Sequence, residues 1–292
     1  MRLLVVGGSG FLGGYVLGEA ARRGHECLAL ARSPKAARTV EGYGAQSIAG
    51  DLDDTRHLDD AFVAARCDAL VCLASLGRGH GPGIVAAAEE AGIQRAVFVS
   101  TTAVMTTLHP PTKKVRLAAE QQIRACPLDW TILRPTMIYG APGDRNLSRL
   151  LTLLSRAAIL PVPGTGSCLH QPVHVADAAA AVLAALEVPA AIGSLYNLAG
   201  PEPLPFTELL HACARAVGSR TRLVPVPLAP LLMLARGYEL VNRHPRIRTE
   251  QLRRLGENKA FAIDHAIRDL GYAPRPFAGG IADEARLLGL AA

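Results

Sequence analysis

The feature that most constrains this chain is a glycine-rich turn at its very start. A short apolar run, RLLVVG (2–7), reads as a buried strand, and a helix is expected to follow it. Between the two lies GGSGFLGG (7–14), with Gly7, Gly10 and Gly13 evenly spaced. Glycine permits a tight turn and a close backbone approach, while a helix N-terminus offers free N–H groups and partial positive charge. This strand–turn–helix arrangement predicts a diphosphate-binding site.

Apolar strands and amphipathic helices alternate along the first half of the chain. Near-continuous apolar strands separated by helices indicate a parallel sheet that is covered on both faces. The expected fold class is therefore α/β, a doubly wound parallel sheet, with residues 1–200 as a dinucleotide-binding domain. Residues 201–292 are predicted to form a small, mostly helical lobe packed on it, joined by some residues of 140–170. The strands are expected at 2–7, 26–31, 46–49, 68–74, 95–100 and 129–135, and the helices at 10–23, from Pro34, and at 55–65, 83–91 and 114–125.

The end of the second strand bears on which dinucleotide is bound. A site specific for NAD usually has Asp or Glu here, which bonds the ribose hydroxyls. This chain has Arg32, followed by Ser33 and Lys35, and a guanidinium can bind the 2′-phosphate of NADP bidentately. We therefore expect NADP, with NAD as the alternative; an ordinary surface arginine is the competing interpretation of Arg32.

Further motifs along the chain resemble a known superfamily. The sequence is similar to the extended or atypical short-chain dehydrogenase/reductases, and within them to the NAD-dependent epimerase/dehydratase and NmrA-like NAD(P)-binding groups. The motifs that carry this resemblance are GGSGFLGG (7–14), AGDLDD (49–54), LVCLAS (70–75), AGIQRAVFVSTTAV (91–104), LDWTILRPTMIYG (128–140), HQPVHVADAAAAVLAAL (170–186) and AIRDLGYAPRPFAGGI (266–281).

The resemblance implies a set of cofactor contacts. Asp51 and Leu52 would lie near the adenine, although Asp51 also reads as a turn or cap residue. Ala74 and Ser75 would run along the ribose, and Pro135 beside the nicotinamide. The full set of expected cofactor-binding residues is Gly7, Gly10, Phe11, Leu12, Gly13, Arg32, Ser33, Lys35, Asp51, Leu52, Ala74, Ser75, Thr101, Arg116 and Pro135.

The catalytic positions depart from the family's pattern. The family normally uses Ser or Thr to polarise a carbonyl, and a Tyr-x-x-x-Lys pair to move the proton. Thr101 aligns with the hydroxyl position, but the pair reads Thr112-x-x-x-Arg116. A guanidinium can hold a ribose hydroxyl or a phosphate, yet it does not readily share its proton. The candidate catalytic residues are Thr101, Arg116 and Tyr139, and further proton-transfer candidates are His170, His174, Lys113 and Lys114, with structural roles as the competing interpretation.

Composition excludes several classes of partner. The net charge of +6 comes without a run of basic residues, so no nucleic-acid partner is indicated. The apolar stretch 224–234 is interrupted by prolines, so we expect no membrane span. The six cysteines form no zinc-like spacing and read as free thiols. A cytoplasmic monomer or homodimer is expected.

Two functions remain open at this point. The first is an oxidoreductase or epimerase acting on a small-molecule substrate, a nucleotide sugar or a related carbonyl or hydroxyl compound. Three arginines, Arg78, Arg145 and Arg149, are available for an anionic group of such a substrate. The second is a non-catalytic protein that senses NADP(H) or serves as a scaffold, as in NmrA-like regulators.

Overall fold

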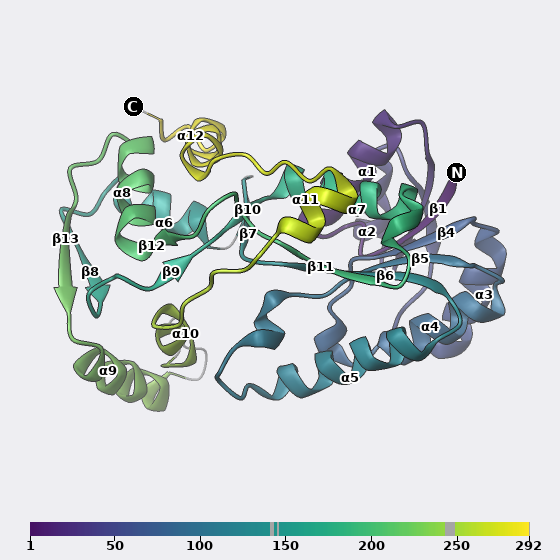
Figure 1. Cartoon of the computed structure of the whole chain (residues 1–292), viewed down its shortest axis with the longest axis horizontal. Helices are drawn as coiled ribbons and strands as arrows, with labels where there is room; N and C mark the ends of the chain where they lie inside the picture. The colour runs from purple at the N-terminus through teal and green to yellow at the C-terminus, as the bar shows by residue number, and fades with distance from the viewer. Residues whose placement is uncertain (141–142, 145, 243–248, 292) are drawn as a thin grey trace.

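A parallel sheet of seven strands organises the N-terminal part of the chain (Figure 1). The computed structural model describes residues 1–140, 143–144, 146–242 and 249–291. The strand order reverses between β1 and β4, which places a crevice at the carboxyl ends of these two strands. In spatial order the strands are β3 (Gln46–Ala49), β2 (Glu26–Ala31), β1 (Arg2–Val6), β4 (Ala69–Cys72), β5 (Arg95–Val99), β6 (Asp129–Pro135) and β11 (Ser194–Leu198).

Helices cover both faces of this sheet, as Figure 1 shows. Successive strand residues point to opposite faces, so Leu3 and Val5 join one apolar core and Leu4 and Val6 join the other. The predicted doubly wound α/β fold is confirmed. The first core packs under α1 (Phe11–Arg22), α2 (Pro34–Glu41), α7 (Val175–Glu187) and α11 (Asp264–Leu270), and the second under α3 (Thr55–Ala65), α4 (Gly81–Glu90) and α5 (Pro111–Ala125).

The observed boundaries follow the sequence pattern closely where the chain alternates strands and helices. β2, β3 and α3 begin and end at the predicted residues. The helix α5 begins at Pro111, before the predicted Lys114, because proline is tolerated in the first turn of a helix. The strand β4 ends at Cys72, before the predicted residue 74.

The remaining elements build the lobe on the left of Figure 1. Its apolar core joins side chains of α6, α8 and α12, so the predicted mostly helical lobe is confirmed. None of the described helices is long and apolar enough to cross a membrane. The lobe elements are α6 (Leu147–Leu154), α8 (Phe206–Ala216), α9 (Leu228–Val241), α10 (Thr249–Leu255) and α12 (Phe277–Leu287), with the short strand pairs β7–β10 (Ile138–Tyr139, Val173–His174), β9–β12 (Leu169–His170, Leu204–Pro205) and β8–β13 (Ile159–Pro163, Arg222–Val226).

The chain returns from the lobe to the sheet before it ends. Ala266, Leu270 and Tyr272, in and just after α11, pack in the core beneath α7. The segment after residue 200 therefore contributes to both parts of the molecule. A division at residue 200 stays a prediction.

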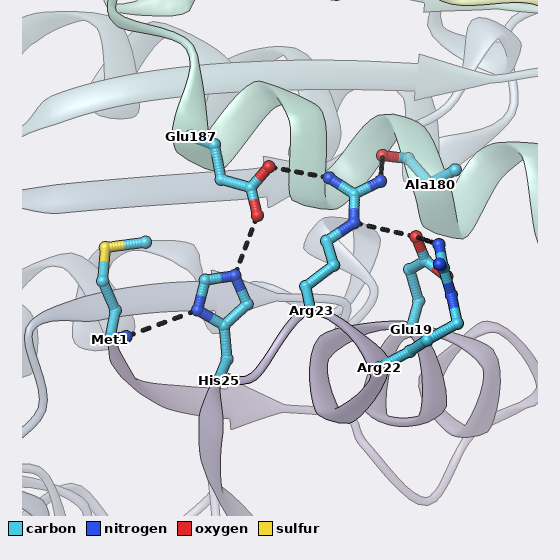
Figure 2. A network of polar contacts seen from close by, with 7 residues as sticks. All are labelled: Met1, Glu19, Arg22, Arg23, His25, Ala180 and Glu187. Carbon is cyan, nitrogen blue, oxygen red and sulfur yellow. Dashed lines mark hydrogen bonds and ion pairs between the residues drawn. The ribbon is translucent and has the colours of Figure 1, made fainter.

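A network of charged side chains fastens the C-terminal end of α1 to α7 (Figure 2). Arg23 donates to Glu19 on its own helix at 2.8 Å and to Glu187 of α7 at 2.7 Å. The other oxygen of Glu187 lies 2.8 Å from Nε2 of His25, whose Nδ1 lies 3.4 Å from the amino group of Met1. These contacts fix α1 at its C-terminal end. The glycine-rich turn lies at the other end of the helix and stays open at the crevice.

Candidate cofactor and substrate site

The glycine-rich turn is built so tightly that it requires its glycines. Gly7 has a φ of +88°, and a Cβ there would lie 3.0 Å from the backbone nitrogen of Ala74. A Cβ on Gly13 would lie 2.3 Å from the carbonyl oxygen of Gly8 and 2.5 Å from that of Gly7. Gly10 precedes α1 and donates its N–H to the Gly7 carbonyl at 3.0 Å. The helix therefore packs directly against the turn, and its first N–H groups face the crevice.

A large cavity of about 1360 Å³ extends from this turn to the lobe. It lies at the carboxyl ends of β4, β5 and β6, where ligands bind in open α/β sheets. One wall follows α1 along its length, from Phe11 to Arg22, and the opposite end is lined by Arg254 of α10 and by the segment before α6. The polar residues lining it include Ser9, Ser75, Ser100, Thr101, Arg116, Thr136, Asp144, Asn146 and Arg254.

Part of the predicted cofactor set lines this cavity. Three of the predicted residues do not line it: Gly7 and Gly13 lie within the tight turn, and Ala74 lies behind it, after the end of β4. Arg32 follows β2, the neighbour of β1, so it lies at the same edge of the sheet as the turn; it is exposed. The predicted residues that line the cavity are Gly10, Phe11, Leu12, Ser75, Thr101, Arg116 and Pro135.

The other predicted cofactor residues do not line the cavity. Ser33 caps α2 by accepting the N–H of Ala36 at 3.3 Å, and Lys35 is exposed. Asp51 accepts the N–H of Asp53 at 3.2 Å, which is a turn contact, and Leu52 packs on the sheet core. These residues stay predictions for the far end of a bound dinucleotide.

The end of β5 presents a hydroxyl group to the cavity. Oγ1 of Thr101 accepts the N–H of Ala103 at 3.2 Å, and its own hydrogen has no acceptor among the described residues. Its neighbour Ser100 instead donates to the buried carboxylate of Glu120 at 2.5 Å. Arg134 also donates to Glu120, through Nε at 3.0 Å and through Nη2. Of these two neighbours, Thr101 is therefore the hydroxyl that can donate to a ligand.

The arginine at the lysine position points into the same cavity. Arg116 lines it and donates from Nη1 to Oγ1 of Thr112, one turn earlier in α5, at 3.0 Å. Burial, and then the charge of Arg254, lowers the pKa of the Arg116 guanidinium. The two neighbouring lysines lie elsewhere: Lys113 donates to the carbonyl of Thr106 at 2.5 Å, and Lys114 is exposed.

Tyr139 lies in the interior of the lobe and not at the cavity. Its ring is fully buried and packs against His174 and Phe277, with centroids 5.3 and 5.1 Å away. Its hydroxyl has no hydrogen-bond partner among the described residues, and burial raises its pKa far above the usual range. The structure does not bring this tyrosine to Thr101, so we do not retain it as a proton donor.

Both histidine candidates are buried and have structural contacts. Nδ1 of His174 accepts the N–H of Ala176 at 3.2 Å and so caps α7 in the neutral state. The ring of His170 packs on Phe206 with centroids 5.0 Å apart. Burial, aided by the charge of Lys259, lowers the pKa of His170 to about 4. Neither histidine lines the cavity, so neither is retained as a proton donor.

The neutral state of His170 has a measurable consequence for stability. Its pKa falls from 6.5 to about 4 on folding, so below pH 6.5 the unfolded chain takes up a proton first. We expect neutral His170 to make its full contribution to the free energy of unfolding above pH 6.5. That contribution, about 1–3 kcal/mol, should be lost as the pH falls from 6.5 to about 4. In denaturant titrations across this range, His170→Gln should lose this pH-dependent component. The exposed control His211→Gln should keep it, and equal slopes for the two variants would contradict the assignment.

Sequence reasoning missed Arg254, which lines the cavity from α10. No local pattern marks it, since it enters the site only through the folding of the lobe. Of the arginines proposed for an anionic group, Arg78 and Arg149 are exposed and outside the cavity lining. Arg145 lies outside the described residues.

Together, the sheet order, the glycine-rich turn and the cavity define a dinucleotide-binding protein of the Rossmann class. A family model described as NAD(P)H-binding matches residues 7–188. The chain belongs to this NAD(P)H-binding family, and its resemblance to the short-chain dehydrogenase/reductases is confirmed.

Two curated relatives are similar over nearly their full length. One is the 4-hydroxy-2-methyl-3-oxo-4-farnesyl-3,4-dihydroquinoline-1-oxide ketoreductase of Stigmatella aurantiaca, 30% identical over 94% of this chain and 92% of the relative. The other is the 2-alkyl-3-oxoalkanoate reductase of Stenotrophomonas maltophilia, 30% identical over 94% of this chain and 95% of the relative. Among solved structures, UDP-glucose 4-epimerase of Thermotoga maritima superimposes with a TM-score of 0.78 at 15% identity, covering 99% of each chain, which shows a shared fold.

Proposed function

We propose that this protein is an NADP(H)-dependent oxidoreductase that interconverts a ketone and an alcohol. The observation that carries the proposal is the single cavity that joins the start of α1 to the free hydroxyl of Thr101 and the guanidinium of Arg116. Both relatives described above are named as reductases of oxo compounds, which supports carbonyl chemistry over a purely structural role.

The cofactor would be held by its diphosphate at the N–H groups of Phe11 and Leu12, since that of Gly10 is bonded to Gly7, with its nicotinamide beside Pro135. When bound, reduced NADP supplies a hydride. Thr101 would donate a hydrogen bond from its free hydroxyl to the carbonyl oxygen, and Arg116 would add positive charge where negative charge develops. The carbonyl carbon gains the hydride, and the oxygen takes its proton from water. Tyr15 and Tyr43 also line the cavity, from α1 and from the segment after α2.

A nucleotide sugar is the alternative substrate class. The solved epimerase of Thermotoga maritima holds UDP-glucose, and the fold of this chain matches it over its length. The alternative without turnover, an NADP(H) sensor, is favoured by one observation: the Tyr-x-x-x-Lys pair reads Thr112 and Arg116, and Tyr139 is buried away from the cavity.

Single-turnover assays separate these functions. Protein loaded with NADPH is mixed with β-keto acids, β-keto esters and UDP-sugars, and loss of the reduced nicotinamide signal is followed. Transfer to a ketone supports the oxidoreductase, and Thr101→Val should slow it about 10²–10³-fold. Thr152→Val, at a threonine of α6 outside the cavity lining that bonds only the Ser148 carbonyl of its own helix, should not. Tight NADPH binding without transfer to any compound would instead support the sensor.

The choice of cofactor should depend on Arg32. This exposed guanidinium has no ion pair with the described residues and is free to take the 2′-phosphate. We expect Arg32→Ala to weaken NADPH binding about 10–100-fold and to leave NADH binding nearly unchanged, since charged hydrogen bonds contribute about 1.5–3 kcal/mol. Calorimetric titrations with both cofactors measure this. Arg38→Ala, an exposed arginine later in α2, is the matched control. Equal losses for NADPH and NADH would contradict the role.

A further inference from the structure

Two guanidinium groups from opposite sides of the molecule line the same cavity. Arg116 comes from α5 beneath the sheet, and Arg254 comes from α10 of the lobe. They are separated by more than a hundred residues in sequence, yet they are close enough that the charge of Arg254 lowers the pKa of Arg116. Two like charges brought together in a partly buried site cost free energy unless an anion lies between them.

The hydrogen-bonding capacity of Arg254 is incompletely used. Its Nε is buried and has no hydrogen-bond partner among the described residues. This nitrogen lies 3.3 Å from Oε1 of Glu250, close enough for an ion pair but without the geometry of a hydrogen bond. Glu250 is itself half-exposed, so water screens its contribution.

A second carboxylate near Arg254, that of Glu257, already accepts several hydrogen bonds. Glu257 accepts hydrogen bonds from the hydroxyl of Thr106 at 2.6 Å and from the N–H and hydroxyl of Thr107 at 2.8 and 2.5 Å. These bonds tie the segment after α10 to the loop after β5 and so connect the lobe to the Rossmann part. Figure 1 shows α10 on the side of the lobe that faces the Rossmann part. Lys259 lies in the same segment, and burial, with a smaller effect from the charge of Arg254, lowers its pKa. Asp144 also lines this end of the cavity, but its carboxylate accepts the N–H groups of Asn146, Leu147 and Ser148. The carboxylates near Arg254 are therefore screened or already bonded.

We propose that Arg254, facing Arg116 across the cavity, binds an oxyanion of the substrate, so that the carbonyl compound carries a carboxylate or phosphate group. Two guanidinium forks match the geometry of such a group, and the ion pair of Nε with Glu250 holds the Arg254 side chain in place. The inference rests on the proposed carbonyl reduction for the rest of the substrate. It places the anion at the lobe end of the cavity, away from the diphosphate of the cofactor at α1.

The test compares a medium-chain β-keto acid, its methyl ester and a keto phosphate of similar length, each with NADPH. For the wild type, we expect kcat/KM for an anionic ketone to exceed that of the ester about 10–100-fold. A larger preference for the keto acid assigns the oxyanion to a carboxylate, and a larger preference for the keto phosphate assigns it to a phosphate ester.

Variants at α10 attribute this preference to Arg254. Arg254→Met should bring the ratio of acid to ester close to one, and Arg254→Lys should keep part of the preference because the charge remains. Arg253→Met removes the neighbouring exposed arginine of the same helix and should leave the ratio unchanged. Thermal unfolding of each variant, with and without NADPH, checks that the fold and the cofactor site are retained, and Arg254→Gln provides a second substitution if Arg254→Met unfolds.

A binding measurement keeps this inference separate from the proposed function. The keto acid is titrated into NADPH-loaded protein by calorimetry, without reliance on turnover. Binding that is lost in Arg254→Met but without any reduction would support the anion site and overturn the reductase. Reduction of the ester with no gain for either anionic ketone, or anion binding that is unaffected by Arg254→Met, would overturn the anion site. The anion site would also be overturned if the keto acid neither bound to the protein nor was reduced in preference to its ester.

Discussion

Gly13→Ala is expected to abolish cofactor binding at ordinary concentrations, with a loss of affinity of at least about 100-fold. The added Cβ would lie 2.3 Å from the carbonyl oxygen of Gly8, which no side chain can relieve because the obstacle is backbone. The turn and the first turn of α1 must move apart, and the N–H groups that face the diphosphate lose their positions. Calorimetric titration with NADPH measures the loss.

A matched glycine tests whether this effect is local. A Cβ on Gly83 of α4 would meet only Cδ2 of Leu58, at 4.0 Å, and Gly83 is outside the cavity lining. Gly83→Ala should leave NADPH affinity unchanged and stabilise the fold by about 0.5–1 kcal/mol, because alanine loses less backbone entropy in a helix. Wild-type affinity in Gly13→Ala would mean that the cofactor does not depend on this turn.

The second large effect is expected at Glu120, beneath the site. Its carboxylate is 3% exposed and accepts hydrogen bonds from Ser100 and Arg134, which fixes the ends of β5 and β6 relative to α5. In Glu120→Leu, the guanidinium of Arg134 would remain largely buried without its partner. Breaking one side of a buried ion pair costs about 3–5 kcal/mol, so we expect a fall in Tm of about 10 °C.

Two control variants test whether this loss of stability comes from the buried ion pair. Glu120→Gln keeps the shape and should lose less stability, because an amide oxygen can still accept one of the bonds. Glu89→Leu removes an exposed glutamate of α4 and should change the Tm little. Calorimetric scans compare the variants, and equal transitions for Glu120→Leu and Glu89→Leu would rule out a structural role for the buried pair.

Much of the Rossmann part was predictable because its signals are local. The alternation of apolar runs with helical patterns, punctuated by residues such as Gly24 and Gly92, defines each strand and helix within a few neighbours. Both glycines have positive φ, +77° and +70°, after the helices that they end. The position of the turn residues at the crevice follows from the parallel sheet alone.

The lobe side of the site carries no such signal. β7 and β10 are two residues long and pair across 35 residues of chain, from Ile138 to Val173, so no periodicity reveals that Tyr139 is buried there. Arg254 reaches the cavity because Glu257 is bonded to the loop after β5. Such contacts depend on tertiary packing, which the local sequence does not encode in a readable pattern.

We propose that one cavity holds the whole reaction, with the cofactor diphosphate at the start of α1 and the nicotinamide beside Thr101. A crystal structure of the protein soaked with NADP tests it most directly. We predict density for the diphosphate at the N–H groups of Phe11 and Leu12, and for the nicotinamide ring within contact of Pro135 and Thr101. Density for NADP at another surface, or a nicotinamide turned away from Thr101, would contradict the account.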